Sequence, residues 1–446
     1  MAGQSAKGGR GGAIHHLFPT TRQSDDRDVS IALRCVNLAQ IGRAYGEEVC
    51  RLALRHVART VAELLGEGGF VNIEADDRLE AVLRDRKLLS AGPPGPACDE
   101  FVRSLCMAIM ARPFEHGEHR IHLSFTGVWS MPATAAADGR VGLPAGSRRP
   151  HDHGRPRNHG AFPADEARAG DGQASRYRAD MALASGLLGL MAADRLTLVW
   201  QRIARAPDEG DILYHEALLR IVADDGADHA PADMLGALER LGLARSLDQF
   251  VVARVLDELE AHPAATLGVN ISAQSAVLDA WWAEAERRLA GNRALARRLV
   301  IEITETAALP SISEAIHFAD RMRALGCRIA MDDFGVGHAS IRQLIALKPD
   351  IVKVADFFMR RAARGERTEL GHMIGLARSI APVVIMEGVE NAADSEFAAQ
   401  AGARWQQGWF WGRPGAARSR GERDACAQPA ALLPVPRPAG PTEAWR

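Results

Sequence analysis

Two short apolar runs that end in acids, LVIE at residues 299–302 and RIAMDD at residues 328–333, set the pattern of the second half of this chain. A helical stretch separates them. Further runs of the same kind lie on both sides: Ile212–Tyr214 before Glu216, Thr266–Val269 before Asn270, and Pro382–Met386 before Glu387. Short strands that alternate with helices indicate a parallel sheet or a β/α barrel.

The polar residues that follow these runs predict a metal site. In a β/α barrel the carboxyl ends of the strands gather on one face. The side chains expected there are Glu216, Asn270, Glu302, Asp332, Asp333 and Glu387. Five acids and an amide in one place repel one another unless cations lie between them, and their oxygens are the ligands that hard divalent cations prefer. Each acid taken alone would more often be a salt-bridge partner, so the prediction depends on the set.

The composition is that of a globular protein with room for two domains. The 446 residues are 25% charged with a net charge of −2, which does not favour a general affinity for DNA. The longest apolar stretch, Met181–Ala193, is too short to span a bilayer, so no membrane segment is expected. No signal peptide is visible, and the six cysteines form no CxxC pair, which predicts reduced thiols in a cytoplasmic protein.

Changes in composition divide the chain into segments. Residues 1–26 and 416–446 are expected to be disordered, and residues 133–184 to form a linker that is irregular through Ala133–Gly172. Residues 27–132 mix strand and helix, and residues 185–415 carry the β/α alternation. In the first of these regions we expect a strand at Ser30–Val36, a helix at Gly46–Leu65, and short strands at Ala81–Leu83 and Ile121–Phe125.

A series of motifs in residues 185–415 resembles the EAL family of cyclic-di-GMP phosphodiesterases. The name-giving triplet is Glu216-Ala217-Leu218 inside YHEALLR. The other motifs, in family order, are WQRI (200–203), VNIS (269–272), EITET (302–306), DDFGVGHAS (332–340), KPDIVKV (348–354), EGVE (387–390) and QGWFWGRP (407–414). A lone triplet would carry no weight, whereas the ordered set is specific.

The resemblance implies an α/β fold with a TIM-barrel-like domain that binds two Mg²⁺ or Mn²⁺ ions and hydrolyses cyclic-di-GMP to linear 5'-pGpG. By resemblance, the metal ligands are Glu216, Asn270, Glu302, Asp332, Asp333 and Glu387. The catalytic residues are Glu387, Lys353 and Glu216, and the substrate-binding residues are Arg220, Gln407 and Leu218. Glu305 and Thr304 position the loop after Asp333, and a homodimer through the EAL domain is expected near that loop.

Several positions depart from the family pattern. Ala355 stands where an Asp usually follows the lysine, and Trp200 and Arg202 replace the tyrosine and proline of the usual YQP. His338 and Trp409 replace tyrosines. The alternative function is therefore a weak or inactive cyclic-di-GMP receptor that signals to a protein partner, with Ala355 as its main support.

Residues 27–132 resemble a degenerate GGDEF domain. The signature position reads Ala75-Asp76-Asp77-Arg78-Leu79, without the glycine pair that lets the backbone approach a nucleotide. Arg34 stands where a metal-binding Asp is expected. Cyclase activity is therefore not expected, and a regulatory or dimerising role and a plain scaffold stay equally open.

Overall fold

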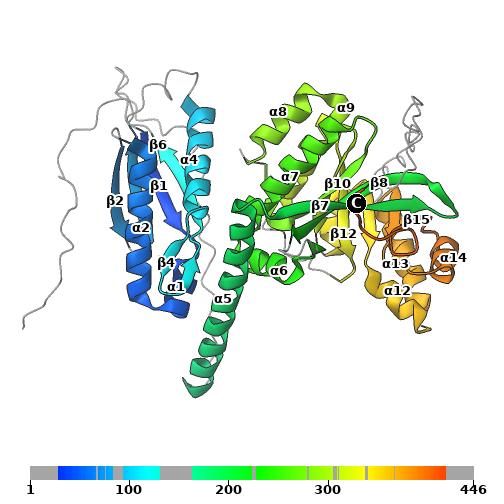
Figure 1. The fold of residues 1–446 in the computed structure, drawn as a ribbon, viewed down its shortest axis with the longest axis horizontal. Coiled ribbons are helices and arrows are strands. Elements are labelled where there is room, and N and C mark those ends of the chain that lie inside the picture. The colour runs from blue at the N-terminus through cyan, green and yellow to red at the C-terminus, as the bar shows by residue number, and fades with distance from the viewer. Residues whose placement is uncertain are drawn as a thin grey trace, which may run out of the picture.

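The computed structural model describes residues 29–66, 69–75, 77–83, 94–130, 163–222, 228–278, 281–304, 309, 311–336, 340–365 and 367–417. The segments expected to be disordered, 1–26 and nearly all of 416–446, lie outside these ranges. The described chain folds into an N-terminal α+β body and a larger β/α barrel, with one long helix between them (Figure 1).

The N-terminal body is an antiparallel sheet with helices packed on it. Its elements are β1 (Val29–Cys35), α1 (Leu38–Tyr45), α2 (Glu47–Leu65), β2 (Gly69–Ala75), β3 (Arg78–Leu83), α4 (Pro94–Met110), β4 (Phe114–His116), β5 (His119–Ile121) and β6 (Phe125–Ser130). Four strands pair in the order β2-β3-β1-β6. Alternate residues of β1 (Val29, Ile31, Leu33) are buried, which is the period of a strand with one face on a core.

One expected strand differs from the observed structure. Ile121–Phe125 is not continuous, because β5 ends at Ile121 and β6 begins at Phe125. Between these strands, the backbone forms hydrogen bonds with the buried side chain of Asn37. Asn37 Nδ2 donates to the His122 carbonyl (3.0 Å), and Asn37 Oδ1 accepts from the backbone N–H of Ser124 (3.0 Å).

The larger body is a closed barrel of eight strands. They are β7 (Leu196–Arg205), β8 (Asp208–Val222), β10 (Leu267–Ser272), β11 (Leu299–Thr304), β12 (Arg328–Phe334), β13 (Ile351–Val354), β14 (Val383–Met386) and β15 (Trp405–Gln406). They pair in the order β10-β11-β12-β13-β14-β15-β7-β8, and β8 pairs with β10 to close the ring; the short strand β9 (Asp228–His229) extends the β8 edge. All the ring pairings are parallel except those of β7, which runs antiparallel to β8 and β15. The expected TIM-barrel-like fold is confirmed, with one reversed strand.

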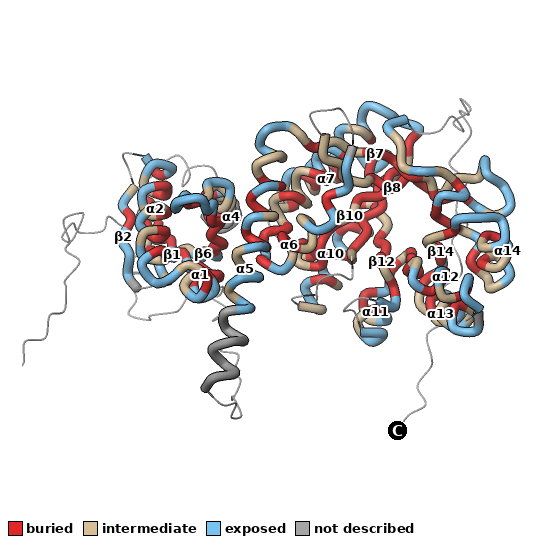
Figure 2. The backbone as a smooth tube through the Cα atoms, turned by 60° about the horizontal axis from the view of Figure 1, so that its bottom comes forward, coloured by how far each residue is buried: buried red, intermediate tan, exposed pale blue. Residues whose placement is uncertain are grey.

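Helices alternate with the strands and cover the barrel. They are α6 (Ala232–Leu241), α7 (Ala244–Ala261), α8 (Ala283–Gly291), α9 (Arg293–Ala296), α10 (Ile312–Leu325), α11 (Ile341–Leu347), α12 (Asp356–Ala363), α13 (Arg367–Ile380) and α14 (Ala392–Ala401), with the 3-10 turn η2 (Ala273–Ser275). Several pack directly on strands, α7 on β10, α10 on β12 and α13 on β13 and β14. Buried residues fill the strands and the facing sides of the helices (Figure 2).

The helix α5 (Pro163–Ala192) contacts both bodies. It corrects the expectation of irregular chain at residues 163–172, whereas residues 133–162 of the predicted linker lie outside the described ranges. Toward the N-terminal body, Tyr177 receives a hydrogen bond from Asn37 (3.4 Å), and Ser185 Oγ donates to the Arg120 carbonyl (2.7 Å). Toward the barrel, Asp180 forms a two-bond ion pair with Arg240 of α6 (2.7 and 2.9 Å). The segment is rich in Ala, and contacts with both neighbours compensate for its glycines. Among the helices of the described ranges, α5 included, none is long and apolar enough to cross a membrane.

Candidate metal centre

The interior of the barrel consists of an apolar layer beneath a polar layer. A buried apolar cluster takes one residue from each of six strands: Ile203, Tyr214, Val300, Ala330, Ile351 and Ile385, with Trp405 packed against it. Two residues further along each parallel strand, toward the carboxyl end, the side chain is polar. The polar set is Glu216, Asn270, Glu302, Asp332, Lys353, Glu387 and Gln407. Because strand side chains alternate with a period of two, both layers face the interior.

Lys353 lies at the centre of the polar layer, and its side chain is 1% exposed. Its Nζ is 3.0 Å from Glu216 Oε2, 2.8 Å from Glu302 Oε2, 2.9 Å from Asp332 Oδ1 and 2.9 Å from Glu387 Oε1. An ammonium group has three N–H donors, so it cannot bond to four carboxylates at once. Fully ionised, these groups would leave three negative charges without a partner, which favours the binding of further cations.

Glu216 is the best-supported carboxylate of the layer. Asn270 Nδ2 donates to its Oε1 (2.6 Å), and Lys353 Nζ and Gln407 Nε2 donate to its Oε2 (3.0 and 2.5 Å). Burial raises the pKa of this carboxyl, but Lys353, Gln407 and Asn270 outweigh that effect, and the pKa lies below its usual value. Glu216 is therefore ionised and held in one orientation.

Two other acids of the layer, Glu302 and Glu387, have raised pKa values. Burial, followed by the charges of Glu216 and Asp332, raises the pKa of Glu302 to about 8 although Lys353 opposes the rise. Burial also raises the pKa of Glu387 well above its usual value. For Lys353, burial lowers the pKa, but the four carboxylates outweigh burial and raise it well above normal. Protons or cations must therefore balance the charge of this layer.

The oxygens of the polar layer fit a hard divalent cation. Within the described ranges, the buried Oε1 of Glu302, Oδ1 of Asn270 and Oε1 of Gln407 accept no hydrogen bond. Oε2 of Glu302 and Oδ1 of Asp332 share the single Lys353 ammonium, at 2.8 and 2.9 Å. The nearest oxygens of Glu216, Glu302 and Asp332 lie within 4.8 Å of one another, close enough to share one ion. A donor set made only of oxygen suits Mg²⁺ or Mn²⁺ rather than metals that prefer sulfur or imidazole.

The EAL domain family matches residues 185–414, which is more than half of the 446 residues and includes the whole barrel. The chain belongs to the EAL family. Residues before 185 lie outside this match.

Relatives of this EAL chain include proteins with assigned names. It is 30% identical over 211 residues to the cyclic di-GMP phosphodiesterase PdeF of Escherichia coli, covering 46% of this chain and 28% of PdeF. It is 22% identical over 399 residues to the bifunctional diguanylate cyclase/cyclic di-GMP phosphodiesterase MucR of Pseudomonas aeruginosa, covering 87% of this chain and 56% of MucR. The chain thus spans less than two thirds of the length of these relatives. Among solved structures it is similar to the MucR phosphodiesterase in complex with c-di-GMP, with a TM-score of 0.46 and 25% identity over 53% of this chain and 98% of that one.

In this EAL barrel, Asp333 lies beside the polar layer through a local irregularity of β12. Adjacent residues of a regular strand point to opposite faces, so Asp332 and Asp333 would normally diverge. Asp333 instead has a left-handed backbone (φ 56°), and the β12–β13 register shifts between Met331 and Phe334. Asp is among the residues that tolerate this conformation best. Burial and then the charge of Asp332 raise the pKa of Asp333 to about 6, although Lys353 opposes the rise.

A glycine makes room for Glu302 in the EAL barrel. At Gly268 of β10, an added Cβ would lie 2.0 Å from Glu302 Oε1 and 2.6 Å from the ring of Tyr214. Gly268 occupies the apolar layer beneath Asn270, and the Tyr214 ring fills the space that a side chain would take. The position of Glu302 therefore depends on the absence of a side chain at residue 268.

The remaining predicted site residues lie at the edges. Leu218 and Arg220 follow Glu216 on β8 at intervals of two and so share its face, and Arg220 Nη1 donates to the Leu219 carbonyl (2.8 Å). Thr304 ends β11, with its Oγ1 3.4 Å from the Ile271 carbonyl. Glu305 lies outside the described residues. The apolar runs end before Glu216, Asn270 and Glu302, whereas β8, β10 and β11 continue past these residues, and β12 likewise contains Asp332 and Asp333.

Sequence reasoning missed one member of the polar layer, Gln201. It lies on β7, opposite Glu216 in the strand register, and is 9% exposed. Since β7 is antiparallel, its polar residue precedes the apolar Ile203 instead of following it, so a search of strand carboxyl ends passes over it. The signal that could have found it is the WQRI motif at residues 200–203.

Proposed function

We propose that this chain is a metal-dependent phosphodiesterase that hydrolyses cyclic-di-GMP to linear 5'-pGpG. The observation that carries the proposal is the polar layer, in which four carboxylates share one lysine and the buried oxygens Glu302 Oε1, Asn270 Oδ1 and Gln407 Oε1 accept no hydrogen bond within the described ranges. Membership of the EAL family and the similarity to a cyclic di-GMP phosphodiesterase support the choice of substrate.

The proposed ligands for two Mg²⁺ or Mn²⁺ ions are Glu216, Asn270, Glu302, Asp332, Asp333 and Glu387. When bound, such ions supply an activated water and neutralise charge on the phosphodiester. Asn270 and Gln407 hold Glu216 in a fixed orientation through its two oxygens. A residue fixed in this way need not reorganise when a ligand binds.

The hydrolytic step assigns further roles to the chain. The water oxygen attacks phosphorus and the bond to the ribose 3'-oxygen breaks, leaving a 5'-phosphate on the linear product. In this proposal Glu387 accepts a proton from the water, Lys353 holds the water or a phosphate oxygen, and the leaving 3'-oxygen takes up a proton from solvent. Arg220 and Leu218, on the face of β8 that bears Glu216, would contact the substrate, since a guanidinium suits phosphate.

The test is a time course of cyclic-di-GMP with the full chain and Mg²⁺ or Mn²⁺, resolved by chromatography. We expect 5'-pGpG from the wild type, loss of turnover in Glu216→Ala, and unchanged turnover in Glu396→Ala, a change on the exterior helix α14. Absence of product from the wild type would contradict the proposal.

A catalytically weak cyclic-di-GMP receptor is the second candidate. The specific observation is Ala355, which directly follows β13, is 0% exposed and lacks the carboxylate usual in the family. Tight nucleotide binding without turnover, and restored turnover in Ala355→Asp, would favour this candidate.

We also propose that residues 27–132 form a degenerate GGDEF-like domain, joined by a linker at 133–184 to an EAL domain at 185–415. The signature position falls at the turn between the antiparallel strands β2 and β3. There Arg34 Nε donates to Asp77 Oδ2 (2.9 Å), so a side-chain cation lies where a metal would be needed. The expected result is no cyclic-di-GMP from GTP and Mg²⁺.

A homodimer through the EAL domain is proposed as well. Three apolar side chains that follow Asp333 in the sequence are exposed, Val336 (50%) and, on α11, Ile341 (49%) and Ile345 (58%). Light scattering should report a dimer for the wild type and a monomer for Ile345→Glu; a dimer in both would contradict this interface.

A further inference from the structure

Gln201 connects the polar layer to the segment that follows β15. The importance of Gln201 for turnover rests on the proposed function. Its Nε2 donates to the Gly412 carbonyl (3.0 Å), and its Oε1 accepts from Gln407 Nε2 (3.2 Å). Gln407 Nε2 in turn donates to Glu216 Oε2 (2.5 Å). Two amides therefore form a continuous relay from a backbone carbonyl to the carboxylate.

The direction of this relay is fixed at both ends. The Gly412 carbonyl can only accept, so the amide nitrogen of Gln201 must face it and the amide oxygen must face Gln407. The carboxylate of Glu216 can also only accept. Both hydrogens of Gln407 Nε2 are therefore used, one toward Gln201 and one toward Glu216, and Gln407 Oε1 is left as a buried acceptor with no hydrogen bond from the described residues.

We infer that Gln201 is a positioning residue that fixes the amide orientation of Gln407, so that Gln407 donates to Glu216 and offers only an acceptor oxygen to a water or substrate donor. If the Gln407 amide turned over, its oxygen would face two acceptors, Glu216 Oε2 and Gln201 Oε1. A buried arrangement with unpaired, facing acceptors is strongly unfavourable.

The backbone around both residues is held in place. The backbone N–H of Gln407 donates to the Met386 carbonyl (2.9 Å), and the backbone carbonyl of Gln407 accepts from the Val389 N–H (3.1 Å). The side-chain torsions of Gln407 are therefore its main remaining freedom. On the other strand, Trp200 and Gly415 exchange two backbone hydrogen bonds (2.9 and 3.1 Å).

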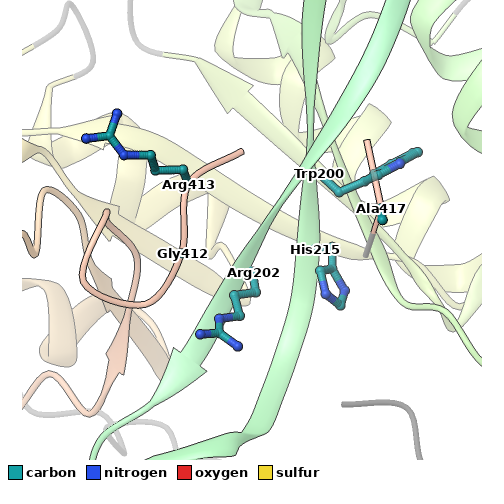
Figure 3. A pocket seen from close by; sticks show the side chains of 6 residues that line it. All are labelled: Trp200, Arg202, His215, Gly412, Arg413 and Ala417. Atoms are coloured by element: carbon teal, nitrogen blue, oxygen red, sulfur yellow. The ribbon is translucent and has the colours of Figure 1, made fainter. Parts of the chain in front are cut away.

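The neighbours of Gln201 point away from the polar layer. Trp200 and Arg202 line a cavity of about 130 Å³ on the outer side of β7 and β8, together with His215, Gly412, Arg413 and Ala417 (Figure 3). Alternation along β7 therefore directs Gln201 inward. Arg202 Nε also donates to the Trp411 carbonyl. A side chain on the outer face of β7 therefore binds the same segment whose Gly412 carbonyl accepts from Gln201.

Two variants at this position separate hydrogen-bond direction from packing. Gln201→Leu retains bulk and removes both bonds. Gln201→Glu retains the acceptor toward Gln407, but when ionised it turns an acceptor toward Gly412; when protonated, its O–H donates to that carbonyl as the amide does. Gln400→Leu, at an exposed glutamine that bonds Glu396, is the control.

The readouts are turnover of cyclic-di-GMP from pH 6 to 8, each divided by the wild-type rate at the same pH, and Mn²⁺ affinity by calorimetry. We expect Gln201→Leu to lose about 10–100-fold in both, which is usual when the partner of a metal ligand is lost. Its turnover deficit should not change with pH, whereas that of Gln201→Glu should shrink as pH falls. Thermal unfolding of each variant checks that the barrel is folded.

Equal, pH-independent deficits in the two variants would overturn the inference, because a packing role predicts that result. Near-wild-type behaviour of a folded Gln201→Leu would overturn it too. If the wild type does not hydrolyse cyclic-di-GMP, the proposed function fails, but the calorimetry still decides the inference: weaker Mn²⁺ binding in Gln201→Leu than in Gln400→Leu supports it, and equal binding refutes it.

Discussion

Replacing Gly268 by Ala tests the geometry of the polar layer with one methyl group. The added Cβ would lie 2.0 Å from Glu302 Oε1, whereas ordinary contact begins at 3.4 Å, so the oxygen must move by about 1.4 Å unless the strand shifts. The carboxylate has little space for this movement, because its side chain is 0% exposed and Lys353 lies 2.8 Å from its other oxygen. The ring of Tyr214, 2.6 Å from the added atom, blocks the other direction.

The displacement sets the expected magnitudes. A shift of about 1 Å at a reacting centre can cost about 100-fold in rate, so Gly268→Ala should lower turnover by at least that factor. The overpacked barrel should lose about 1–3 kcal/mol of unfolding free energy. Gly375→Ala is the matched control, because Gly375 lies on helix α13 with nothing within 4 Å of the added Cβ. It should retain activity and gain about 0.5–1 kcal/mol, as expected for Ala in place of Gly in a helix.

The assay combines steady-state turnover, Mn²⁺ calorimetry and urea unfolding for the wild type and both variants. Wild-type turnover and Mn²⁺ affinity in Gly268→Ala would refute the reasoning, because Glu302 would then tolerate displacement and could not be a ligand held in place by its surroundings.

Three further predictions concern the charges of the layer. Lys353→Met removes the one ammonium among four buried carboxylates, which should lower the free energy of unfolding by about 3–5 kcal/mol. The melting temperature of the chelator-treated protein should then fall by about 6–20 °C, and an unchanged melting curve would contradict the ion pairs. Asp333→Asn should retain the fold, because Asn tolerates the left-handed backbone, yet weaken Mn²⁺ binding, whereas Asp333→Ala should also lower stability by about 1 kcal/mol in urea unfolding. Mn²⁺ affinity should rise with pH between 6 and 8, because the carboxyls of Asp333 (pKa about 6) and Glu302 (pKa about 8) must release protons to bind metal. Calorimetry in buffers of different ionisation enthalpy should detect those protons. An affinity that does not change with pH would count against both residues as ligands.

Much of the barrel can be predicted from sequence because its strands are short apolar runs in regular alternation with helices. Local pattern cannot say where a strand ends, however. The apolar run before Glu302 ends at Ile301, yet pairing with β12 carries β11 to Thr304. Pairing with β7 likewise extends β8 to Val222, beyond the strand expected at Ile212–Leu218. Helix α5 also escapes prediction, because its glycines and weak periodicity resemble a linker until two neighbouring bodies pack against it.

The sequence predicts the candidate site as a collection of residues, without the contacts that support them. The rule that strand carboxyl ends meet on one face brings Glu216, Asn270 and Asp332 together. It says nothing of Lys353 as the common partner of the four carboxylates, or of Gly268 as the space for Glu302, because those contacts join different strands. The reversed strand β7 hides Gln201 from the same rule.

The helix α5 separates two meanings of the word domain. The match to the EAL family begins at Ser185, within this helix. Asp180, which holds Arg240 of the barrel, and the buried Met181 lie before that point. A chain shortened to begin at residue 185 would therefore leave a cation without its partner and bare the side of α6. The segment that matches the EAL family is therefore smaller than the unit whose contacts complete the barrel.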